Sequence, residues 1–220
     1  MRATDDRYRG EQARFELALR MIKHEARTGT IRFWTGVNDD RIRKLYSTYF
    51  KFGEIPVRRR RGRSPTRIGP LVRTPTRALE SGLFANLLLA NGLFSVDAPP
   101  GPSLKGNIDL GHRFCECFET YDMLVPRGVL SFEWGWNLLM SIRRGDELGI
   151  ARCDNCSVCY VFDLLSLPRS ACPACRVVED RADVALSLVA AQVIRDERAA
   201  RQRRGRGARV AKVRDCREPA

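Results

Sequence analysis

Apolar residues recur at helical spacing near the start of the chain. Five of them follow an i, i+3, i+4, i+7, i+11 pattern, namely Phe15, Ala18, Leu19, Ile22 and Ala26. This pattern places all five side chains on one face of an α-helix. We therefore predict a helix over Glu11–Arg27 that ends near Gly29.

The next segment, TGVNDDRIRKLYSTYF, predicts a second helix behind a helix cap. Asn38 is a good N-cap residue, and the acids after it favour the positive helix N-terminus. An apolar stripe follows, formed by Ile42, Leu45, Tyr46 and Tyr49. With Gly36 in the preceding turn, the spacing suits a DNA-reading helix-turn-helix that exposes Arg41, Arg43 and Lys44. An amphipathic helical hairpin without DNA contacts fits the same pattern equally well.

The pattern predicts three further helices and little strand. The helices cover Ala78–Asn91, which is apolar on most sides, Ile108–Leu124 and Val129–Arg144. Gly145 stands where a C-cap belongs. Strand signals are weak before Ile150, and Tyr160 to Phe162 suit one short strand. The sequence therefore predicts a mainly α fold.

Positive charge is concentrated in two segments that contain no acid. Residues 58–77 and 198–214 each contain eight Lys or Arg. Taking these sixteen charges from the net charge of +13 leaves −3 for the rest of the chain. Gly and Pro interrupt the first segment, and Gly and Ala dilute the second, so we expect flexible arms on a nearly neutral core.

Such arms suit a polyanion, because each Lys or Arg that neutralises a phosphate releases counterions. Solvated linkers are the alternative interpretation, but two basic segments favour nucleic acid. The candidate phosphate-binding residues of the first arm are Arg58, Arg59, Arg60, Arg61, Arg63 and Arg67.

Five of the eight cysteines lie within RCDNCSVCYVFDLLSLPRSACPACR. Cys153-x-x-Cys156 and Cys172-x-x-Cys175 are separated by fifteen residues, which fits a structural zinc site. Two tight turns aim four thiolates at one ion, and four protein ligands leave no position for a catalytic water. The sequence therefore predicts one zinc ion per chain, held by these four cysteines.

Other uses of the cysteines remain open at this point. Cys159 completes a CxxCxxC run, so the set Cys156, Cys159, Cys172 and Cys175 is an alternative. We prefer Cys153 because residues 160–162 look like the strand that leaves the first turn. An iron-sulfur cluster or redox chemistry would use the same residues. Cys115 and Cys117 are two apart on a predicted helix, so they point to different faces as core or surface thiols.

Several classes of protein are disfavoured. The two histidines, His24 and His112, lie in no nucleophile or zinc-deaminase motif, so we expect no enzyme. The longest apolar stretch, Leu83 to Leu89, is far shorter than the roughly 20 residues that span a bilayer. The first twenty residues lack an apolar signal region, which favours the cytoplasm, where CxxC pairs more often bind metal than form disulfides.

The order of these segments resembles the FlhC family of flagellar transcriptional activator subunits. The resemblance rests on RIRKLYSTYF, on a basic loop, on FEWGWNLLMSIRRGDELGIARC and on the two CxxC pairs. It runs from about Glu11 to Arg176. In that resemblance Cys153, Cys156, Cys172 and Cys175 are the zinc ligands, and Cys159 is not a ligand.

The resemblance implies a DNA-binding activator of flagellar and other operons. Members of this family act with FlhD, as two FlhC and four FlhD subunits, on double-stranded promoter DNA, which they bend, and they help to recruit RNA polymerase. A zinc-ribbon protein that binds RNA or ribosomes without a partner is the alternative.

The expected organisation has five parts. They are a helical, helix-turn-helix-like region (1–56), an arginine-rich loop (57–77), a helical core (78–148), a small C-terminal four-cysteine, zinc-ribbon-like module (149–178), and a helix with a basic, disordered tail (179–220).

Overall fold

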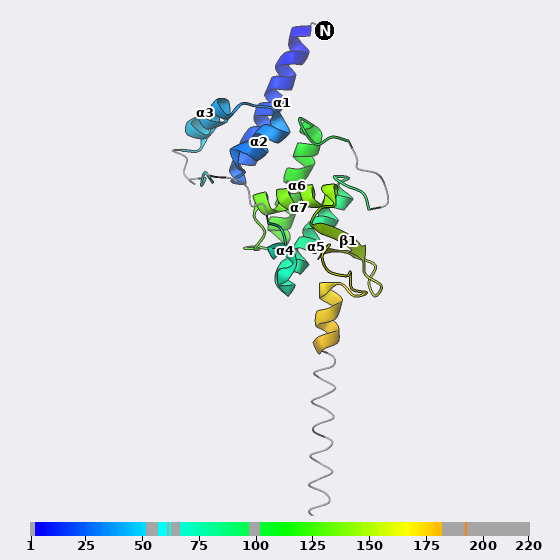
Figure 1. The fold of residues 1–220 in the computed structure, drawn as a ribbon. Coiled ribbons are helices and arrows are strands. Elements are labelled where there is room, and N and C mark those ends of the chain that lie inside the picture. Colours follow the sequence, from blue (N-terminus) through cyan, green and yellow to red (C-terminus); the bar gives the residue numbers. More distant parts are fainter. Residues whose placement is uncertain are drawn as a thin grey trace, which may run out of the picture. The chain divides into compact units, whose positions relative to one another are not determined.

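The computed structural model describes residues 3–51, 57–60, 62, 67–96, 102–181 and 192. The chain divides into two compact units, Met1–Pro173 and Ala174–Ala220. The first unit holds seven helices and one two-stranded sheet among its described residues (Figure 1). In the second unit, the described residues up to 181 are helical. The predicted mainly α fold with a small C-terminal, zinc-ribbon-like four-cysteine module is confirmed, and this module contains a two-stranded hairpin.

The first predicted helix is shifted and shorter at its C-terminal end. Helix α1 covers Ala3–Lys23 and stops four residues before the predicted end. Glu25 then adopts the left-handed conformation, with φ of 58°. A residue with a Cβ atom rarely adopts that conformation. The sequence therefore has no glycine at this position to mark the end of the helix. The most buried face of α1 carries Leu17, Ala18 and Met21.

A short helix, α2 (Thr28–Thr35), was not predicted, and Gly29 lies inside it instead of ending α1. Threonine, glycine and isoleucine are poor helix formers, so propensity argues against this helix. Tertiary contacts override propensity here, because Ile31 and Trp34 are buried. The carboxylate of Glu133 accepts the Arg27 backbone N–H at 2.6 Å and so caps α2 from another helix.

Helix α3 (Asp39–Tyr49) begins where the sequence predicted. The Asn38 side chain accepts the Arg41 backbone N–H at 2.9 Å, which confirms the N-cap. Gly36, in the three-residue connection from α2, has a φ of 69°. The apolar stripe is narrower than predicted, because Ile42 is buried whereas Tyr49 is 60% exposed.

Helices α6 and α7 pack against their neighbours at two glycines. Helix α6 covers Ile108–Leu124, as predicted, and α7 covers Phe132–Arg144. A Cβ on Gly111 would lie 2.5 Å from a Leu17 methyl carbon, and one on Gly135 would lie 2.7 Å from the Phe84 ring. Only glycine permits these close approaches, which let α1 and α5 pack against α6 and α7.

Helix starts in the middle of the chain also differ from the prediction. Helix α4 (Pro70–Arg73) and the first turn of α5 (Pro75–Ala90) lie in the segment that was expected to be an arginine-rich loop. Proline suits the first turn of a helix, where its missing N–H is not needed. Helix α7 begins at Phe132 because Ser131 is its N-cap, and Gly145 is its C-cap, as predicted.

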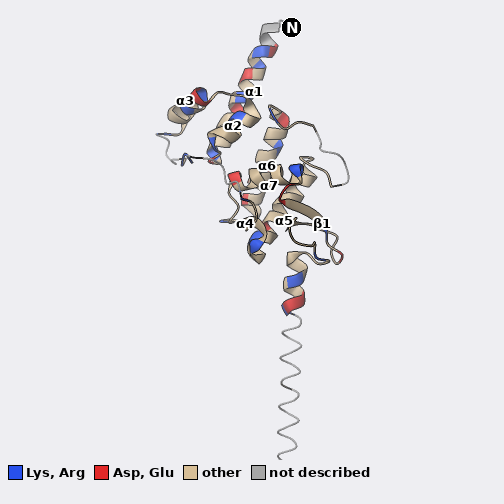
Figure 2. Ribbon diagram, viewed as in Figure 1, with Lys and Arg blue, Asp and Glu red and all other residues tan. Residues whose placement is uncertain are grey.

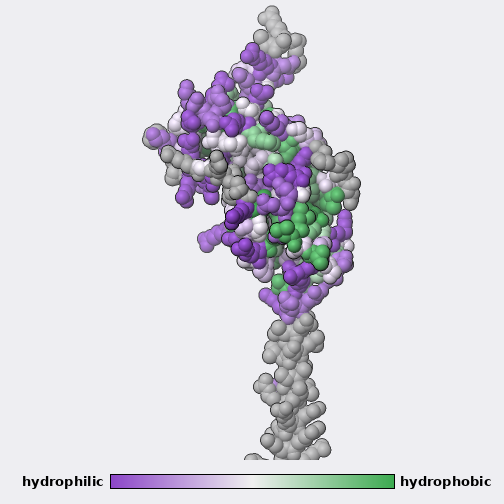
Figure 3. Space-filling view, in the orientation of Figure 1, coloured by the Kyte–Doolittle hydropathy of each residue, from purple (hydrophilic) through white to green (hydrophobic). Residues whose placement is uncertain are grey.

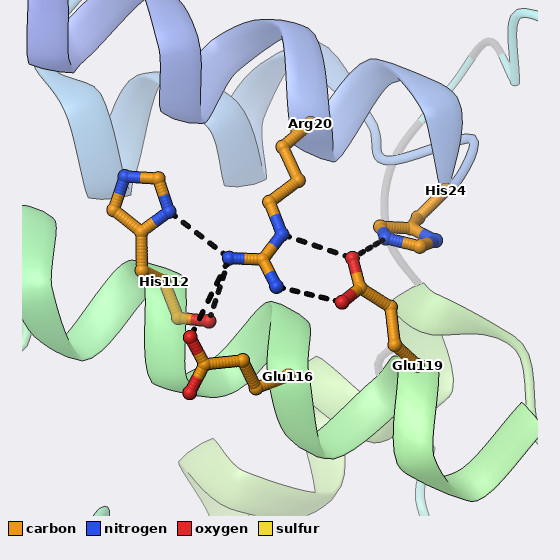
Figure 4. A network of polar contacts seen from close by, with 5 residues as sticks. All are labelled: Arg20, His24, His112, Glu116 and Glu119. Carbon is orange, nitrogen blue, oxygen red and sulfur yellow. Dashed lines mark hydrogen bonds and ion pairs between the residues drawn. The ribbon is translucent and has the colours of Figure 1, made fainter.

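A polar network joins α1 to α6 (Figure 4). The Arg20 guanidinium donates to both oxygens of Glu119, at 2.9 and 2.6 Å. His24 contacts the same carboxylate at 2.8 Å, and its ring stacks on Phe132. The Arg20 hydrogen bond, followed by that of His24, holds the pKa of Glu119 at about 2. This network holds α1 against α6. Because α2 and α3 also pack on α1, it helps to position them on the core.

The only sheet among the described residues is an antiparallel hairpin of β1 (Leu148–Arg152) and β2 (Cys159–Asp163). Its register pairs Arg152 with Cys159. Strand β2 packs on α5, where a Cβ built on Gly82 would lie 3.9 Å from the Tyr160 Cα. No helix in the described part of the chain is long and apolar enough to cross a membrane.

Candidate metal centre

The hairpin turn positions the first two cysteines of the centre. Cys153 follows β1 directly, and its backbone N–H donates to the Val158 carbonyl at 3.0 Å. The Ser157 N–H donates back to the Cys153 carbonyl at 2.9 Å, while Ser157 itself has a φ of 60°. This tight turn holds both Cys153 and Cys156 at the tip of the hairpin.

The second cysteine pair is tied to the first through backbone hydrogen bonds. The Asp154 N–H donates to the Ser170 carbonyl at 2.9 Å, and the Cys172 N–H donates to the Cys153 sulfur at 3.2 Å. The Tyr160 hydroxyl also donates to the Arg169 carbonyl. These bonds bring the segment before Cys172 back over the hairpin tip.

The sulfur atoms of Cys153, Cys156, Cys172 and Cys175 lie within 4.8 Å of one another. The sulfur atoms of Cys156 and Cys172 are 3.7 Å apart. In a tetrahedral site with metal–sulfur bonds of about 2.3 Å, neighbouring sulfurs are about 3.8 Å apart. The geometry therefore fits one metal ion bound by four thiolates.

Hydrogen bonds prepare one of these thiols for metal binding. The Cys172 backbone N–H, with smaller contributions from the backbone of Cys156 and Asn155, lowers the pKa of Cys153 to about 6. Hydrogen bonds to the charged form favour that form, and the thiolate is the metal ligand. These hydrogen bonds therefore favour the thiolate form of Cys153, which is the form that binds a metal ion.

Cys159, the spare cysteine of the CxxCxxC run, lies outside this cluster. It is buried at the start of β2, and its carbonyl accepts the Asn86 amide at 2.6 Å. The same amide donates to the Gly82 carbonyl at 2.7 Å. Asn86 therefore joins α5 to the base of the hairpin. Sequence reasoning missed this role, because a lone asparagine in an apolar helix shows no partner.

Cys115 and Cys117 also lie apart from the cluster. Both are fully buried on α6, and burial raises the pKa of each thiol to about 12. They point to different faces, but α6 is covered on both faces, by α1 and by α5. They are therefore core residues, not reactive thiols.

The predicted DNA-reading residues lie on the exposed surface of α3. Arg41, Arg43 and Lys44 are all exposed. Arg43 forms an ion pair with Asp40 at 2.7 Å, and Arg41 lies 3.7 Å from Glu11. Figure 2 shows Lys and Arg beside Asp and Glu on this helix, and Figure 3 shows the surface around it as mostly hydrophilic. Part of the positive charge is thus balanced locally.

The described part of the arginine-rich segment begins against α3. The Tyr46 hydroxyl donates to the Val57 carbonyl at 2.5 Å, a contact that the sequence pattern did not reveal. Arg58 is exposed, Arg59 is half-buried, and Arg60 forms an ion pair with Glu25 at 2.8 Å. The structure therefore brings Arg58 to the same side of the molecule as α3.

The remaining predicted basic residues are only partly described. Arg67 is exposed at the end of the segment. Arg61, Arg63 and the basic tail, 198–214, lie outside the described residues.

Comparison with protein-family models finds no matching family, and comparison with curated proteins finds no similar sequence. The resemblance to FlhC therefore rests on the motifs of the sequence and stays a prediction.

Proposed function

We propose that the four-cysteine cluster binds one zinc ion with a purely structural role. Zinc is the ion that four thiolates at CxxC spacing most often hold, and four protein ligands leave no open position for substrate or water. The bound ion would link the hairpin tip to the segment that ends at Cys175. The hydrogen bonds that lower the pKa of Cys153 favour its thiolate form, which supports this use.

We propose further that the chain is a DNA-binding subunit of a transcriptional activator. One observation carries the proposal: a capped helix, joined to α2 by a three-residue turn, exposes three basic residues beside the start of an arginine-rich segment. Helix-turn-helix proteins place such a second helix in the major groove. The arginines that follow are suited to phosphates, which fix register without reading sequence.

The proposed partner is an FlhD-like protein, and the proposed targets are promoters of flagellar operons, where the complex would assist RNA polymerase. This part rests on the resemblance of the sequence to FlhC. Asp40 and Glu11 form ion pairs with Arg43 and Arg41, and their negative charges oppose phosphate binding. We therefore expect α3 alone to bind DNA with modest affinity, which fits a need for a partner.

The test is a gel shift with the full-length, metal-loaded chain across a salt series. A flagellar promoter fragment is compared with a scrambled duplex, each with and without the FlhD-like protein of the same organism. We expect a selective shift that needs the partner. In the triple variant Arg41→Ala, Arg43→Ala, Lys44→Ala, the negative slope of log binding constant against log salt concentration should become less steep. The change should be about 0.9 for each lost phosphate contact.

The matched control carries Lys105→Ala and Arg127→Ala, two exposed basic residues far from α3 in the sequence. Its salt slope should match the unmodified chain. Tighter binding to structured RNA than to duplex DNA, with no need of a partner, would instead support the RNA-binding alternative.

A further inference from the structure

The four cysteines of the candidate metal centre differ in their exposure to solvent. Cys153 and Cys172 are buried and Cys175 is half-buried, whereas Cys156 is exposed. The whole turn that carries it, residues 154–158, is exposed as well. A thiolate reacts with a dissolved oxidant only where the oxidant can reach the sulfur atom. Cys156 is therefore the ligand that such an oxidant reaches first.

The other described cysteines are shielded from the same reaction. Cys115 and Cys117 are fully buried on α6, where burial raises the pKa of each thiol to about 12. Cys159 is buried at the start of β2. Thiols buried in apolar surroundings are inert towards oxidants. Within the described part of the chain, Cys156 is thus the only exposed cysteine.

A second sulfur atom lies beside that of Cys156. The Cys172 sulfur is 3.7 Å away, and both residues belong to the same compact unit. Cys172 is held in this position by its backbone N–H, which donates to the Cys153 sulfur at 3.2 Å. The sulfur atoms of a disulfide bond are about 2.05 Å apart, so these two need to approach by only about 1.7 Å.

A disulfide bond between Cys156 and Cys172 would join the same two segments that a bound metal ion joins. It would link the hairpin tip to the returning segment, sixteen positions later in the chain. The Asp154 N–H already donates to the Ser170 carbonyl across this gap. A covalent link of this length restricts the unfolded chain and so stabilises the fold. We therefore expect the tip to keep its fold when the disulfide replaces the metal ion.

We propose that Cys156 is an oxidation site for peroxides, and that Cys172 closes a disulfide bond with it and so releases the metal ion. This inference rests on the proposed metal-binding function. It leaves the role of the ion structural and makes the thiolates that hold it responsive to oxidants. Hydrogen peroxide is uncharged, so the opposite charges of Arg152 and Asp154 beside the turn do not govern its approach.

The reaction has two steps, and its atoms and electrons balance. The Cys156 thiolate attacks one peroxide oxygen, the O–O bond breaks, and a sulfenic acid and a hydroxide ion form. The Cys172 thiolate then attacks the Cys156 sulfur, an S–S bond forms, and a second hydroxide ion leaves. Two thiolates have then given two electrons to the peroxide, and two protons from the solvent convert the hydroxide ions to water.

The same reaction explains both the loss of metal and its return. Sulfur atoms in a disulfide are no longer thiolates, and the thiolate is the metal ligand. Only Cys153 and Cys175 of the four-cysteine cluster then remain as ligands, so the affinity for zinc falls. A dithiol reductant restores both thiolates by exchange, and the cluster can bind zinc again.

Peptide mapping of the metal-loaded full-length chain tests this oxidation site. The chain is treated with equimolar hydrogen peroxide beside a chromogenic zinc chelator, its free thiols are alkylated, and it is digested with trypsin. Cleavage after Arg152, Arg169 and Arg176 places Cys156 and Cys172 on different peptides, 153–169 and 170–176. We expect zinc to be released as a Cys156–Cys172 bond links these peptides, and dithiothreitol with added zinc to reverse both changes.

Two variants locate the reacting sulfur. Cys156→His keeps a fourth ligand without a thiol, because zinc also accepts three cysteines and one histidine. Native mass spectrometry first measures its zinc, which peroxide should then release about tenfold more slowly than from the unmodified chain. Cys159→Ala removes a buried thiol of the same hairpin and is the matched control. It should release zinc at the unmodified rate.

The other outcomes separate failure of the oxidation site from failure of the metal centre. A zinc-loaded chain that keeps its zinc in peroxide, or whose disulfide lies within one CxxC pair, overturns the oxidation site and leaves the metal centre intact. Equal release from zinc-loaded Cys156→His and the unmodified chain overturns it too. If Cys156→His holds no zinc, the peptide map of the unmodified chain decides alone. An unmodified chain without zinc before peroxide is added overturns the proposed metal binding and the oxidation site with it.

Discussion

The α2–α3 pair and the β1–β2 hairpin belong to the same compact unit but are ordered by different forces. The helix pair is held by buried apolar side chains such as Ile31, Trp34 and Ile42, and by caps at Glu133 and Asn38. The hairpin has only five residues in each strand, and its tip is organised around four sulfur atoms. A two-stranded hairpin alone is at best marginally stable in water.

The two regions therefore depend on different interactions for their stability and for their proposed functions. The helix pair needs no ligand for its fold, and its proposed function depends on surface charge that ion pairs partly neutralise. The hairpin carries the four-cysteine cluster at its tip, where we propose a bound metal ion. Its base rests on α5, where the Asn86 amide donates to the Cys159 carbonyl. Changes at the hairpin should therefore affect stability most, and changes on α3 should affect DNA binding with little effect on stability.

Removal of the metal should have the largest effect. Structural zinc contributes roughly 10–16 kcal/mol of apparent binding energy in small zinc-finger peptides, much of it realised as folding. In a chain of this size each kcal/mol shifts Tm by about 2–4 °C, so we expect a chelator to lower Tm by at least about 10 °C. Thermal melts followed by circular dichroism, with and without phenanthroline, measure this shift.

Restoring zinc to the chelated chain should return the original Tm. A melt that does not change with chelator would show that the hairpin folds without metal, and the contrast between the two regions would then disappear.

Asn86→Ala should have the next largest effect. The change leaves the buried Cys159 carbonyl without its side-chain donor, which costs about 1–3 kcal/mol. Because the lost bond joins the hairpin to α5, zinc should also transfer faster to a chromogenic chelator. Asn91→Ala is the control, since the Asn91 side chain donates to the Leu87 carbonyl of α5 and interacts with Cys117 on α6, and neither partner belongs to the hairpin. Equal zinc release by the two variants would mean that α5 does not support the metal centre.

Glu119→Gln should loosen α1 by a smaller amount, about 1 kcal/mol at neutral pH, because its carboxylate is partly exposed. The folded pKa, about 2, lies below the ordinary 4.5, so the charged carboxylate stabilises the fold above pH 4.5. That contribution is lost as the pH falls towards 2. Urea unfolding at several pH values should give a shallower acid loss for the variant than for the original chain.

Glu116→Gln is the matched control, because Glu116 lies on the same helix but 3.7 Å from Arg20. If both variants show the same acid profile as the original chain, the network in Figure 4 does not hold α1 in place.

Asp40→Asn should have the smallest effect on stability, within about 0.5 kcal/mol, because an exposed ion pair contributes little. It releases Arg43 and removes a negative charge from the proposed DNA-binding helix. We therefore expect tighter duplex binding at low salt, by up to about tenfold, in fluorescence anisotropy. Weaker binding would show that α3 does not face the phosphates.

The features that could be predicted from the sequence are those marked by nearby residues, such as capping residues or closely spaced cysteines. Asn38 and Gly145 marked helix ends by known capping chemistry, and the spacing of the four clustered cysteines was enough to identify the candidate metal ligands. Helix α6 was predicted to the residue, and the structure adds a local N-cap, because the Asn107 side chain accepts the Leu110 N–H. Each of these signals lies within a few residues of the feature that it marks.

Features that depend on distant residues were missed. Helix α2 exists because its side chains are buried and Glu133, about one hundred residues later, caps it. The end of α1 depends on a left-handed glutamate, which no local rule favours. The role of Asn86 depends on a carbonyl in β2. A single sequence contains no signal for such pairings, because they are set by tertiary packing.

The most direct test of the metal centre is native mass spectrometry of the full-length chain after expression with zinc. We compare the unmodified chain with Cys153→Ala and Cys159→Ala, which alter two buried cysteines of the same hairpin. The four-sulfur cluster predicts one zinc ion in the unmodified chain and in Cys159→Ala, and none in Cys153→Ala. Retention of zinc by Cys153→Ala together with its loss from Cys159→Ala would contradict the ligand set and the hairpin geometry on which the account depends.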